Sequence, residues 1–241
     1  MRVLRAVIGG VGELLVTAGV LVLLFVVWQV GYTSLIDARA QQSLAGDLEH
    51  QTTAGADDPT LGLPDIGVDP TASPSATQPT LDDGRVFAII RVPRFGEGWA
   101  RAVYEGVRLD TLRGGPGHYP KTALPGEIGN MSIAGHRTTY GHPFYDLDQV
   151  QPGDVIVIET RKAYVIYRAE STRIVKPRQV EVIAAVPGKP NATPTEAWLT
   201  LTTCNPKFSD RERFVLHAKL DRVVPREQGP PPELTAPLGG A

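Results

Sequence analysis

The sequence has very little cysteine, because Cys204 is the single one among 241 residues. One cysteine excludes the internal disulfide framework that stabilises many small exported domains, so the fold must depend on a hydrophobic core. A lone thiol is either a small buried hydrophobic side chain or a reactive group. Cys204 follows an apolar, β-branched run, Trp198–Thr203, and Arg213 lies nine residues further on. This setting favours a nucleophile.

Positive charge is missing from a stretch near the N-terminus. Residues 41–84 contain no Lys or Arg, although they contain eight acidic residues and five prolines. Such a composition cannot bury enough apolar surface to fold on its own. The sequence therefore predicts a flexible acidic linker over residues 33–84, whose 41–84 part would span roughly 35–40 Å.

Charge of either sign is absent from residues 14–30, and residues 6–30 carry only Glu13. A helix of this length can cross the hydrocarbon core of a bilayer. Because Arg2 and Arg5 precede it, residues 1–5 are predicted to be cytoplasmic, residues 6–32 to form a membrane anchor, and the remainder to be extracytoplasmic. A cleaved signal peptide is the alternative, since Ala38-Arg39-Ala40 has the form of a cleavage site.

The charge balance changes again in residues 85–225, which contain 20 basic and 14 acidic side chains. These basic residues are scattered and predicted to be extracytoplasmic, which argues against nucleic acid as a partner. Residues 85–225 are predicted to form one folded domain, and the Pro/Gly-rich residues 226–241 a disordered tail.

The folded domain has the pattern of short strands with few helices. Its candidate strands are rich in Val, Ile, Thr and aromatic residues and are separated by Gly and Pro; they are residues 85–92, 130–134, 154–160, 163–168, 171–175, 198–203 and 213–220. Closely spaced strands of this kind indicate a mainly β fold closed into a barrel. Brief helices are expected near residues 106–112 and 144–150.

Three chemically useful side chains stand at ends of these strands. His136 follows the strand at 130–134, Cys204 follows the strand at 198–203, and Arg213 opens the next strand. A thiol, an imidazole and a guanidinium on one side of a barrel suit acyl transfer, in which a thiolate attacks, His protonates the leaving amine and a cation stabilises the oxyanion. Taken singly, Arg213 could equally pair with Asp210 or Glu212 on the surface.

The other histidines give weaker signals. His142 lies six residues after His136, a spacing that does not match the usual helical metal pair, and no Asp, Glu or Cys stands at a familiar ligand spacing. No metal site is predicted. His217 falls within an alternating strand and is expected to be a face residue of the sheet.

Two segments resemble sequence motifs of the sortases, membrane-anchored cysteine transpeptidases of Gram-positive bacteria. Residues 200–215, TLTTCNPKFSDRERFV, are similar to the sortase cysteine signature, and residues 133–141, IAGHRTTYG, to the catalytic-histidine motif. The resemblance covers roughly residues 84–223. It implies an eight-stranded β-barrel with Cys204 as nucleophile, His136 as general acid and base, and Arg213 as oxyanion or substrate clamp, with Arg211 as the alternative.

Within that family, Asn205-Pro206 and the loop at residues 115–120, GPGHYP, are similar to class E sortases of Actinobacteria; class D is the alternative. The class E resemblance implies a Leu-Ala-x-Thr-Gly sorting signal on secreted proteins, with substrate-binding roles for Tyr119 and Thr203 and with His118 beside the groove. The signal would be cleaved between Thr and Gly through a thioester on Cys204 and passed to an amine of the peptidoglycan precursor lipid II.

The resemblance implies no cofactor. Some sortases bind calcium, but here the candidate acidic residues are scattered, as Glu105, Asp146 and Glu181 illustrate, so no metal requirement is predicted.

Other functions fit the sequence less well. L,D-transpeptidases surround their cysteine with a Ser-x-Gly-Cys-x-Arg pattern, whereas Thr203 and Asn205 flank Cys204 here, and papain-like wall hydrolases place the cysteine before the histidine. A noncatalytic barrel that binds the cell wall would tolerate replacement of Cys204.

Overall fold

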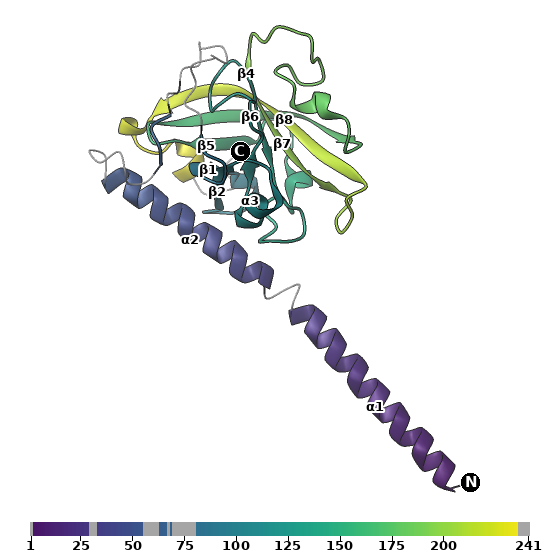
Figure 1. The fold of residues 1–241 in the computed structure, drawn as a ribbon. Helices are drawn as coiled ribbons and strands as arrows, with labels where there is room; N and C mark the ends of the chain where they lie inside the picture. The colour runs from purple at the N-terminus through teal and green to yellow at the C-terminus, as the bar shows by residue number, and fades with distance from the viewer. Residues whose placement is uncertain (1, 29–32, 55–62, 67, 69–80, 236–241) are drawn as a thin grey trace.

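The computed structural model describes residues 2–28, 33–54, 63–66, 68 and 81–235 (Figure 1). Eight strands make a closed barrel in the order β1-β2-β3-β4-β7-β8-β6-β5, which confirms the predicted fold class. The strands are β1 (Val86–Arg91), β2 (Ala100–Glu105), β3 (Gly117–His118), β4 (Gly129–Ala134), β5 (Val155–Glu159), β6 (Ala163–Val175), β7 (Ala197–Asn205) and β8 (Glu212–Pro225).

Most neighbouring strands are antiparallel, but β2–β3 and β4–β7 are parallel. The two strands predicted at 163–168 and 171–175 form one strand, β6, which follows β8 through two register shifts. The sequence pattern missed β2 and β3. Short helices occur close to the predicted places, as α3 (Leu109–Gly114) and the 3-10 turn η3 (Leu147–Gln149).

The barrel interior is filled by aliphatic and aromatic side chains from almost every strand. Buried residues of the main core include Phe87, Ile90, Met131, Ile133, Ile158, Val165, Tyr167, Leu199, Leu201 and Leu216. Each fully buried apolar side chain of this size contributes about 1.5–3 kcal/mol relative to exposure. This packing makes the barrel a rigid frame for the loops at its ends.

The predicted flexible linker is wrong for its first part. Helix α2 (Thr33–Ala54) lies along the barrel and packs mainly on β2 (Figure 1). Ala45 is fully buried together with Leu63 and with Ile89 of β1, and Glu49 pairs with Arg91. The prolines that suggested an irregular segment begin only after α2, so a helix with an apolar face was possible here. Residues 55–62, 67 and 69–80 lie outside the described residues.

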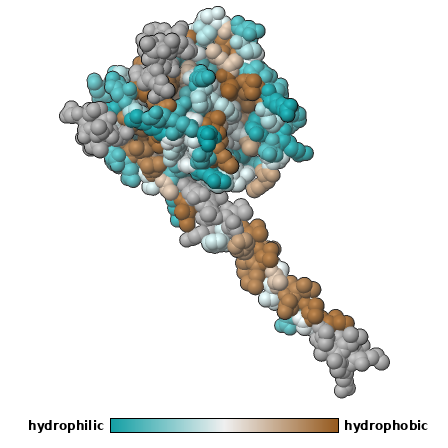
Figure 2. Space-filling view, in the orientation of Figure 1, coloured by the Kyte–Doolittle hydropathy of each residue, from teal (hydrophilic) through white to brown (hydrophobic). Residues whose placement is uncertain are grey.

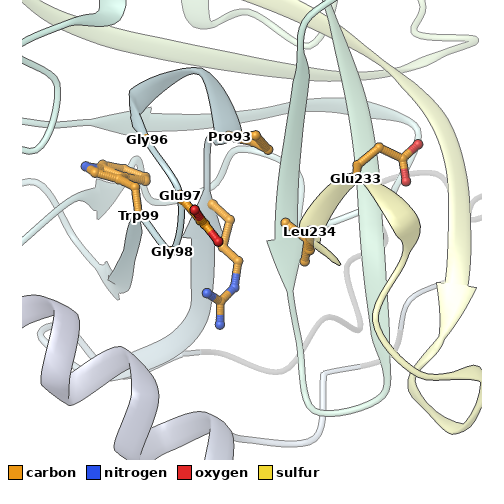
Figure 3. A pocket seen from close by; sticks show the side chains of 8 residues that line it. Pro93, Gly96, Glu97, Gly98, Trp99, Glu233 and Leu234 are labelled. Atoms are coloured by element: carbon orange, nitrogen blue, oxygen red, sulfur yellow. The ribbon is translucent and has the colours of Figure 1, made fainter. Parts of the chain in front are cut away.

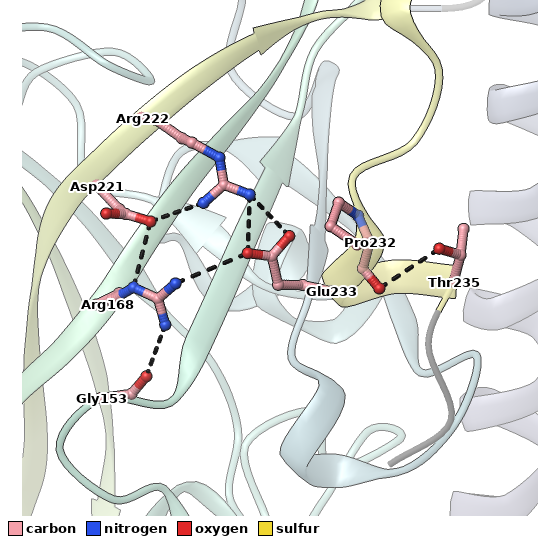
Figure 4. A network of polar contacts seen from close by, with 7 residues as sticks. All are labelled: Gly153, Arg168, Asp221, Arg222, Pro232, Glu233 and Thr235. Carbon is pink, nitrogen blue, oxygen red and sulfur yellow. Dashed lines mark hydrogen bonds and ion pairs between the residues drawn. The ribbon is translucent and has the colours of Figure 1, made fainter. Parts of the chain in front are cut away.

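The predicted disorder of the tail is also wrong for its first ten residues. A 3-10 turn, η5 (Arg226–Gln228), leads into α4 (Pro232–Thr235). Glu233 accepts two hydrogen bonds from Arg222, at 2.8 and 2.9 Å, and lies 3.7 Å from Arg168 (Figure 4). These charge-assisted bonds dock the segment on β6 and β8. Residues 236–241 lie outside the described residues.

Docking of α4 leaves a small pocket against the β1–β2 connection, between Leu234 and Trp99 (Figure 3). Its cavity volume is about 40 Å³, which suits only a few water molecules. We assign it no function.

Helix α1 (Arg2–Val27) projects away from the barrel and is apolar along most of its length (Figures 1 and 2). Residues 8–27 have a mean hydropathy of 2.4 and none of them is buried. By length and composition this helix could cross a membrane, as the sequence predicted. The last residues of the predicted anchor, 29–32, lie outside the described part of the chain.

Candidate active site

His136 and Cys204 are brought to the same edge of the barrel by the parallel pairing of β4 and β7. Ala134 is in register with Thr202, and the Gly135 N–H donates to the Thr202 carbonyl at 3.0 Å. His136 and Cys204 each come two residues after that pair. Parallel strands end at the same edge, so a histidine just after β4 and a cysteine near the end of β7 line the same cleft.

Tight packing holds the chain just before His136. A Cβ atom on Gly135 would lie 2.6 Å from the ring of Phe144, so only glycine fits this position. The Thr203 hydroxyl donates to the Gly135 carbonyl at 2.7 Å, and the Phe144 N–H donates to the His136 carbonyl at 3.1 Å. These contacts attach the histidine loop to the cysteine strand.

The two side chains open onto one cleft with a cavity volume of about 400 Å³. Its walls come from the loop after β4 and the β7–β8 connection, and they are formed by His136, Arg137, Thr138, Thr139, Cys204, Phe208, Ser209 and Asp210. Cys204 is a free, half-buried thiol, and Phe208 exposes 76% of its surface at the rim. The cleft is therefore open to solvent beside the thiol.

The environment of His136 favours its neutral form. Burial lowers the pKa of His136, and the positive charge of Arg113 lowers it further. Its Nε2 atom is buried without a hydrogen-bond partner in the described part of the chain. The His136 ring packs on Tyr140 at 4.9 Å between centroids, and the Arg113 guanidinium lies over the same Tyr140 ring, 5.5 Å from its centroid. A neutral imidazole with a free nitrogen can accept a proton from a thiol.

Arg213 pairs in register with Cys204, which places the predicted clamp directly across from the thiol on β8. Its guanidinium donates to the carbonyls of Asp210 and Glu212, at 2.8 and 2.9 Å, and thereby supports the β7–β8 connection. The alternative residue, Arg211, lies within that exposed connection. The role of Arg213 toward a substrate stays a prediction.

The two predicted substrate-binding residues differ in accessibility. The Tyr119 hydroxyl is 3.0 Å from the Thr202 hydroxyl, two residues before Cys204 on β7. Thr203 is 2% exposed, and its hydroxyl is engaged by Gly135. Substrate binding by either residue stays a prediction, and the structure favours Tyr119 as the one that a substrate could reach.

His118 does not lie beside the groove as expected. It is 2% exposed, and its Nδ1 lies 2.7 Å from the Glu105 carboxylate. Its Nε2 lies 2.8 Å from the Thr122 hydroxyl and 3.1 Å from the Ala123 carbonyl. The side chain points into the barrel because His118 belongs to β3 and pairs with the core residue Ile133. His118 therefore supports the loop that carries Tyr119.

Sequence reasoning gave no role to Arg137, although it directly follows His136. Its guanidinium is 3% exposed and donates to the Cys204 carbonyl at 3.3 Å and to the Asn205 side chain at 3.0 Å. It also pairs with Asp148 at 2.8 Å and lies over the Phe214 ring. Arg137 thus connects the histidine loop to the backbone of the nucleophile. Its position after the histidine was the only sequence signal.

His217 is a sheet residue, as predicted, and it is buried. Burial and the charge of Arg173 lower its pKa to about 4. Thr200 donates to Asn130 at 2.7 Å, so the His217 Nδ1–H donates to the Thr200 hydroxyl at 2.9 Å. Over the described ranges, no cluster of three or more His, Cys, Asp or Glu side chains forms a candidate metal site.

A closed barrel with a cysteine and a histidine at the ends of two parallel strands defines a candidate thiol acyltransferase. The sortase domain family matches residues 90–221, which is more than half of the sequence. The chain therefore belongs to the sortase family.

The relatives include class E sortases. The chain is 32% identical to sortase SrtE1 of Streptomyces coelicolor, over 94% of this chain and 60% of that relative. It is also 32% identical to sortase SrtE2 of the same organism, over 97% of this chain and 90% of that relative. Sortase E from Streptomyces avermitilis has a similar structure, with a TM-score of 0.59 and 38% identity over 64% of this chain and 99% of that one. The predicted similarity to class E is confirmed. The chain spans only 60% of the length of SrtE1.

Proposed function

We propose that this protein is a membrane-anchored cysteine transpeptidase that cleaves a Leu-Ala-x-Thr-Gly-like signal between Thr and Gly. The part of the substrate protein that ends in Thr would be held as a thioester on Cys204 and then transferred to an amine of the peptidoglycan precursor lipid II. The observation that carries the proposal is the parallel β4–β7 pair, which brings His136 and Cys204 to one open cleft.

The proposed reaction has four proton transfers through one imidazole, two for each half of the reaction. Neutral His136 takes the thiol proton of Cys204, and the thiolate attacks the Thr carbonyl carbon. The Thr–Gly bond breaks, a thioester forms, and the imidazolium of His136 gives its proton to the leaving Gly amine. An acceptor amine then attacks the thioester carbonyl, and a new amide bond forms as the C–S bond to Cys204 breaks. His136 takes the proton of the acceptor amine and returns it to the leaving thiolate.

The neighbouring side chains would divide the remaining tasks. Arg213, opposite Cys204, is proposed to stabilise the oxyanion or the substrate backbone, since a guanidinium offers fixed donors. Tyr119 is proposed to fill the space beside a small Ala side chain of the signal and to offer its hydroxyl, which already contacts Thr202. Thr203 would act through the Gly135 carbonyl that it holds.

The proposed location is the cell membrane, with residues 1–5 in the cytoplasm and the barrel outside. The apolar span at residues 8–27 and the preceding arginines support this orientation. Because Cys204 is the only cysteine of this chain, a membrane-impermeant maleimide added to intact cells should label the wild-type protein and should leave the Cys204→Ala protein unlabelled. Labelling only after cell lysis would contradict this orientation.

The catalytic proposal is tested with the full chain in detergent, two quenched peptides with Leu-Ala-x-Thr-Gly or Leu-Pro-x-Thr-Gly, and a small amine. Intact mass should show a thioester on the wild type, formed faster with the Ala peptide, and no adduct on Cys204→Ala. Faster reaction with the Pro peptide would contradict the proposed signal. No adduct with either peptide on a folded, alkylatable protein would contradict transpeptidation.

A further inference from the structure

Arg101 is a buried cation that the proposed reaction does not use. It lies on β2, in register with the core residue Ile90, and exposes 5% of its surface. In the described part of the chain, its only hydrogen bond is from Nη1 to the Ala100 carbonyl at 2.8 Å, and no carboxylate lies within ion-pair distance. Its Nε–H is buried without an acceptor among the residues that the structure describes. The Trp99 ring lies 5.0 Å from its guanidinium carbon.

An arrangement of this kind is unfavourable for folding alone. Removing a guanidinium from water costs free energy unless an anion or several acceptors replace the water. Burial lowers the pKa of Arg101 to about 10, so the side chain still carries its charge at neutral pH. By contrast, the buried Arg137 beside Cys204 forms an ion pair with the Asp148 carboxylate and donates hydrogen bonds to two further oxygen atoms.

Arg101 lines a cavity of about 180 Å³ at the edge of the barrel. Phe95 and Trp99 form one wall, with their rings edge to face at 4.9 Å. The opposite wall comes from the loop that follows His136, through His142, Pro143, Tyr145 and Asp146. Pockets for drug-sized ligands are about 300–1,000 Å³, so this volume suits a single small ionic group.

The remaining charges of the cavity do not neutralise Arg101. Asp146 accepts a hydrogen bond from Gln149 at 2.8 Å and lies 3.7 Å from the Lys207 ammonium, which also lies over the Tyr145 ring. Its negative charge therefore already has a cation. Among the described residues, the cavity retains the uncompensated charge of Arg101, and His142 and Tyr145 are further residues with polar groups on its wall.

We propose that this cavity is a binding site for an oxyanion, a carboxylate or phosphate group, with Arg101 as its main ligand. The guanidinium has free N–H groups with which to bind two oxygens of such an anion, and the aromatic wall limits the competition from water. The proposal stands on these contacts alone and does not depend on the transpeptidase activity. Because the loop after His136 lines both this cavity and the catalytic cleft, the anionic ligand would bind next to the reaction site.

The test measures the melting temperature of the full chain in detergent, with tryptophan fluorescence as the signal. Sodium phosphate or sodium acetate replaces sodium chloride at constant ionic strength and pH. At ten times its dissociation constant, a bound anion should raise the melting temperature by about 3–6 °C. Arg101→Met should abolish this increase. It should melt in chloride no lower than the wild type, because it loses an unpaired charge.

Arg94→Met is the matched control, since Arg94 lies seven residues away but is exposed and paired with Asp154 at 2.6 Å. It should keep the full anion response, and Arg101→Lys should keep part of it. An increase with phosphate alone identifies a phosphate site, and an increase with acetate alone a carboxylate site. An equal increase in Arg101→Met, or no increase with either anion in the wild type, would overturn the proposal.

Discussion

Strand β7 carries two buried polar regions whose difference explains where chemistry can occur. In the middle of the strand, Thr200 connects Asn130 of β4 to His217 of β8 through hydrogen bonds of 2.7 and 2.9 Å. At its end, Cys204 is half-buried and faces a cleft. The first region is closed by neighbouring strands, whereas loops form the walls of the second.

His217 in the middle of the sheet and His136 at the cleft show the same contrast between a closed and an open environment. Burial is the main cause of a lowered pKa in both His136 and His217. His217 uses Nδ1 for a hydrogen bond inside the sheet, while His136 lines the cleft beside Cys204. A neutral imidazole therefore serves structure in one place and is available for proton transfer in the other. Mutations at the two places should separate stability from activity.

The largest expected effect is at the strand end. Cys204→Ala should abolish the thioester, and His136→Ala should reduce kcat/KM by about 10²–10⁴ because it removes the general acid and base. Both variants should keep a melting temperature close to that of the wild type, since neither side chain belongs to the main core. Peptide cleavage and thermal unfolding, measured on the same samples, check the prediction. Full activity of either variant would mean that the end of β7 differs from its middle in structure but not in catalytic role.

The next largest effect is expected for Arg137→Met, whose free energy of unfolding should fall by about 3 kcal/mol. The change leaves the Cys204 carbonyl and the Asn205 side chain without their donor, and Asp148 without its cation. Because the nucleophile backbone loses a support, kcat should fall by more than KM rises. Urea unfolding and steady-state kinetics test both effects. Arg137→Lys should recover part of the kcat, whereas equal losses in both variants would argue for bulk destabilisation only.

Local patterns in the sequence were enough to predict a β-barrel and to place His136 and Cys204 each at the end of a strand. Alternating β-branched residues mark strands, and both functional residues directly follow such runs. The parallel pairing of β4 with β7 joins segments about 70 residues apart, so the nearness of these side chains came from the family resemblance and not from local pattern. Short strands such as β3, with two residues, have no periodicity to detect.

Errors in the sequence interpretation concern segments whose structure depends on the barrel. Helix α2 has a weak apolar face, and Ala45 is buried because it packs with Leu63, Ile89 and Ala100, which lie outside the helix. The tail segment likewise depends on the ion pairs of Glu233 with β6 and β8. Arg137 was missed for a similar reason, since its acceptors lie 67 and 68 residues away.

Low pH should reduce the free energy of unfolding through His217, which is buried in the middle of the sheet. Its folded-state pKa of about 4 lies below the ordinary value of 6.5, so between these values the unfolded chain holds a proton that the native chain lacks. Stability is therefore lost as pH falls from about 6.5 to 4, by up to about 3 kcal/mol. His217→Asn, which can still donate to Thr200, should flatten this part of the pH profile in urea unfolding. An unchanged slope would assign the acid sensitivity to other groups.

The smallest effect is expected at Tyr119, which contacts β7 between the two polar regions. Thr202 lies between Thr200 and Cys204 on β7, and its hydroxyl contacts Tyr119 at 3.0 Å. Tyr119→Phe removes this hydrogen bond and keeps the ring, so stability should fall by only about 1 kcal/mol. If Tyr119 belongs to the open region, the preference for the Ala peptide over the Pro peptide should fall several-fold while the thioester still forms. Competition between the two peptides measures this ratio directly. An unchanged ratio together with the lost stability would place Tyr119 with the structural hydrogen bonds in the middle of β7, and would leave the choice of signal to the loops of the cleft.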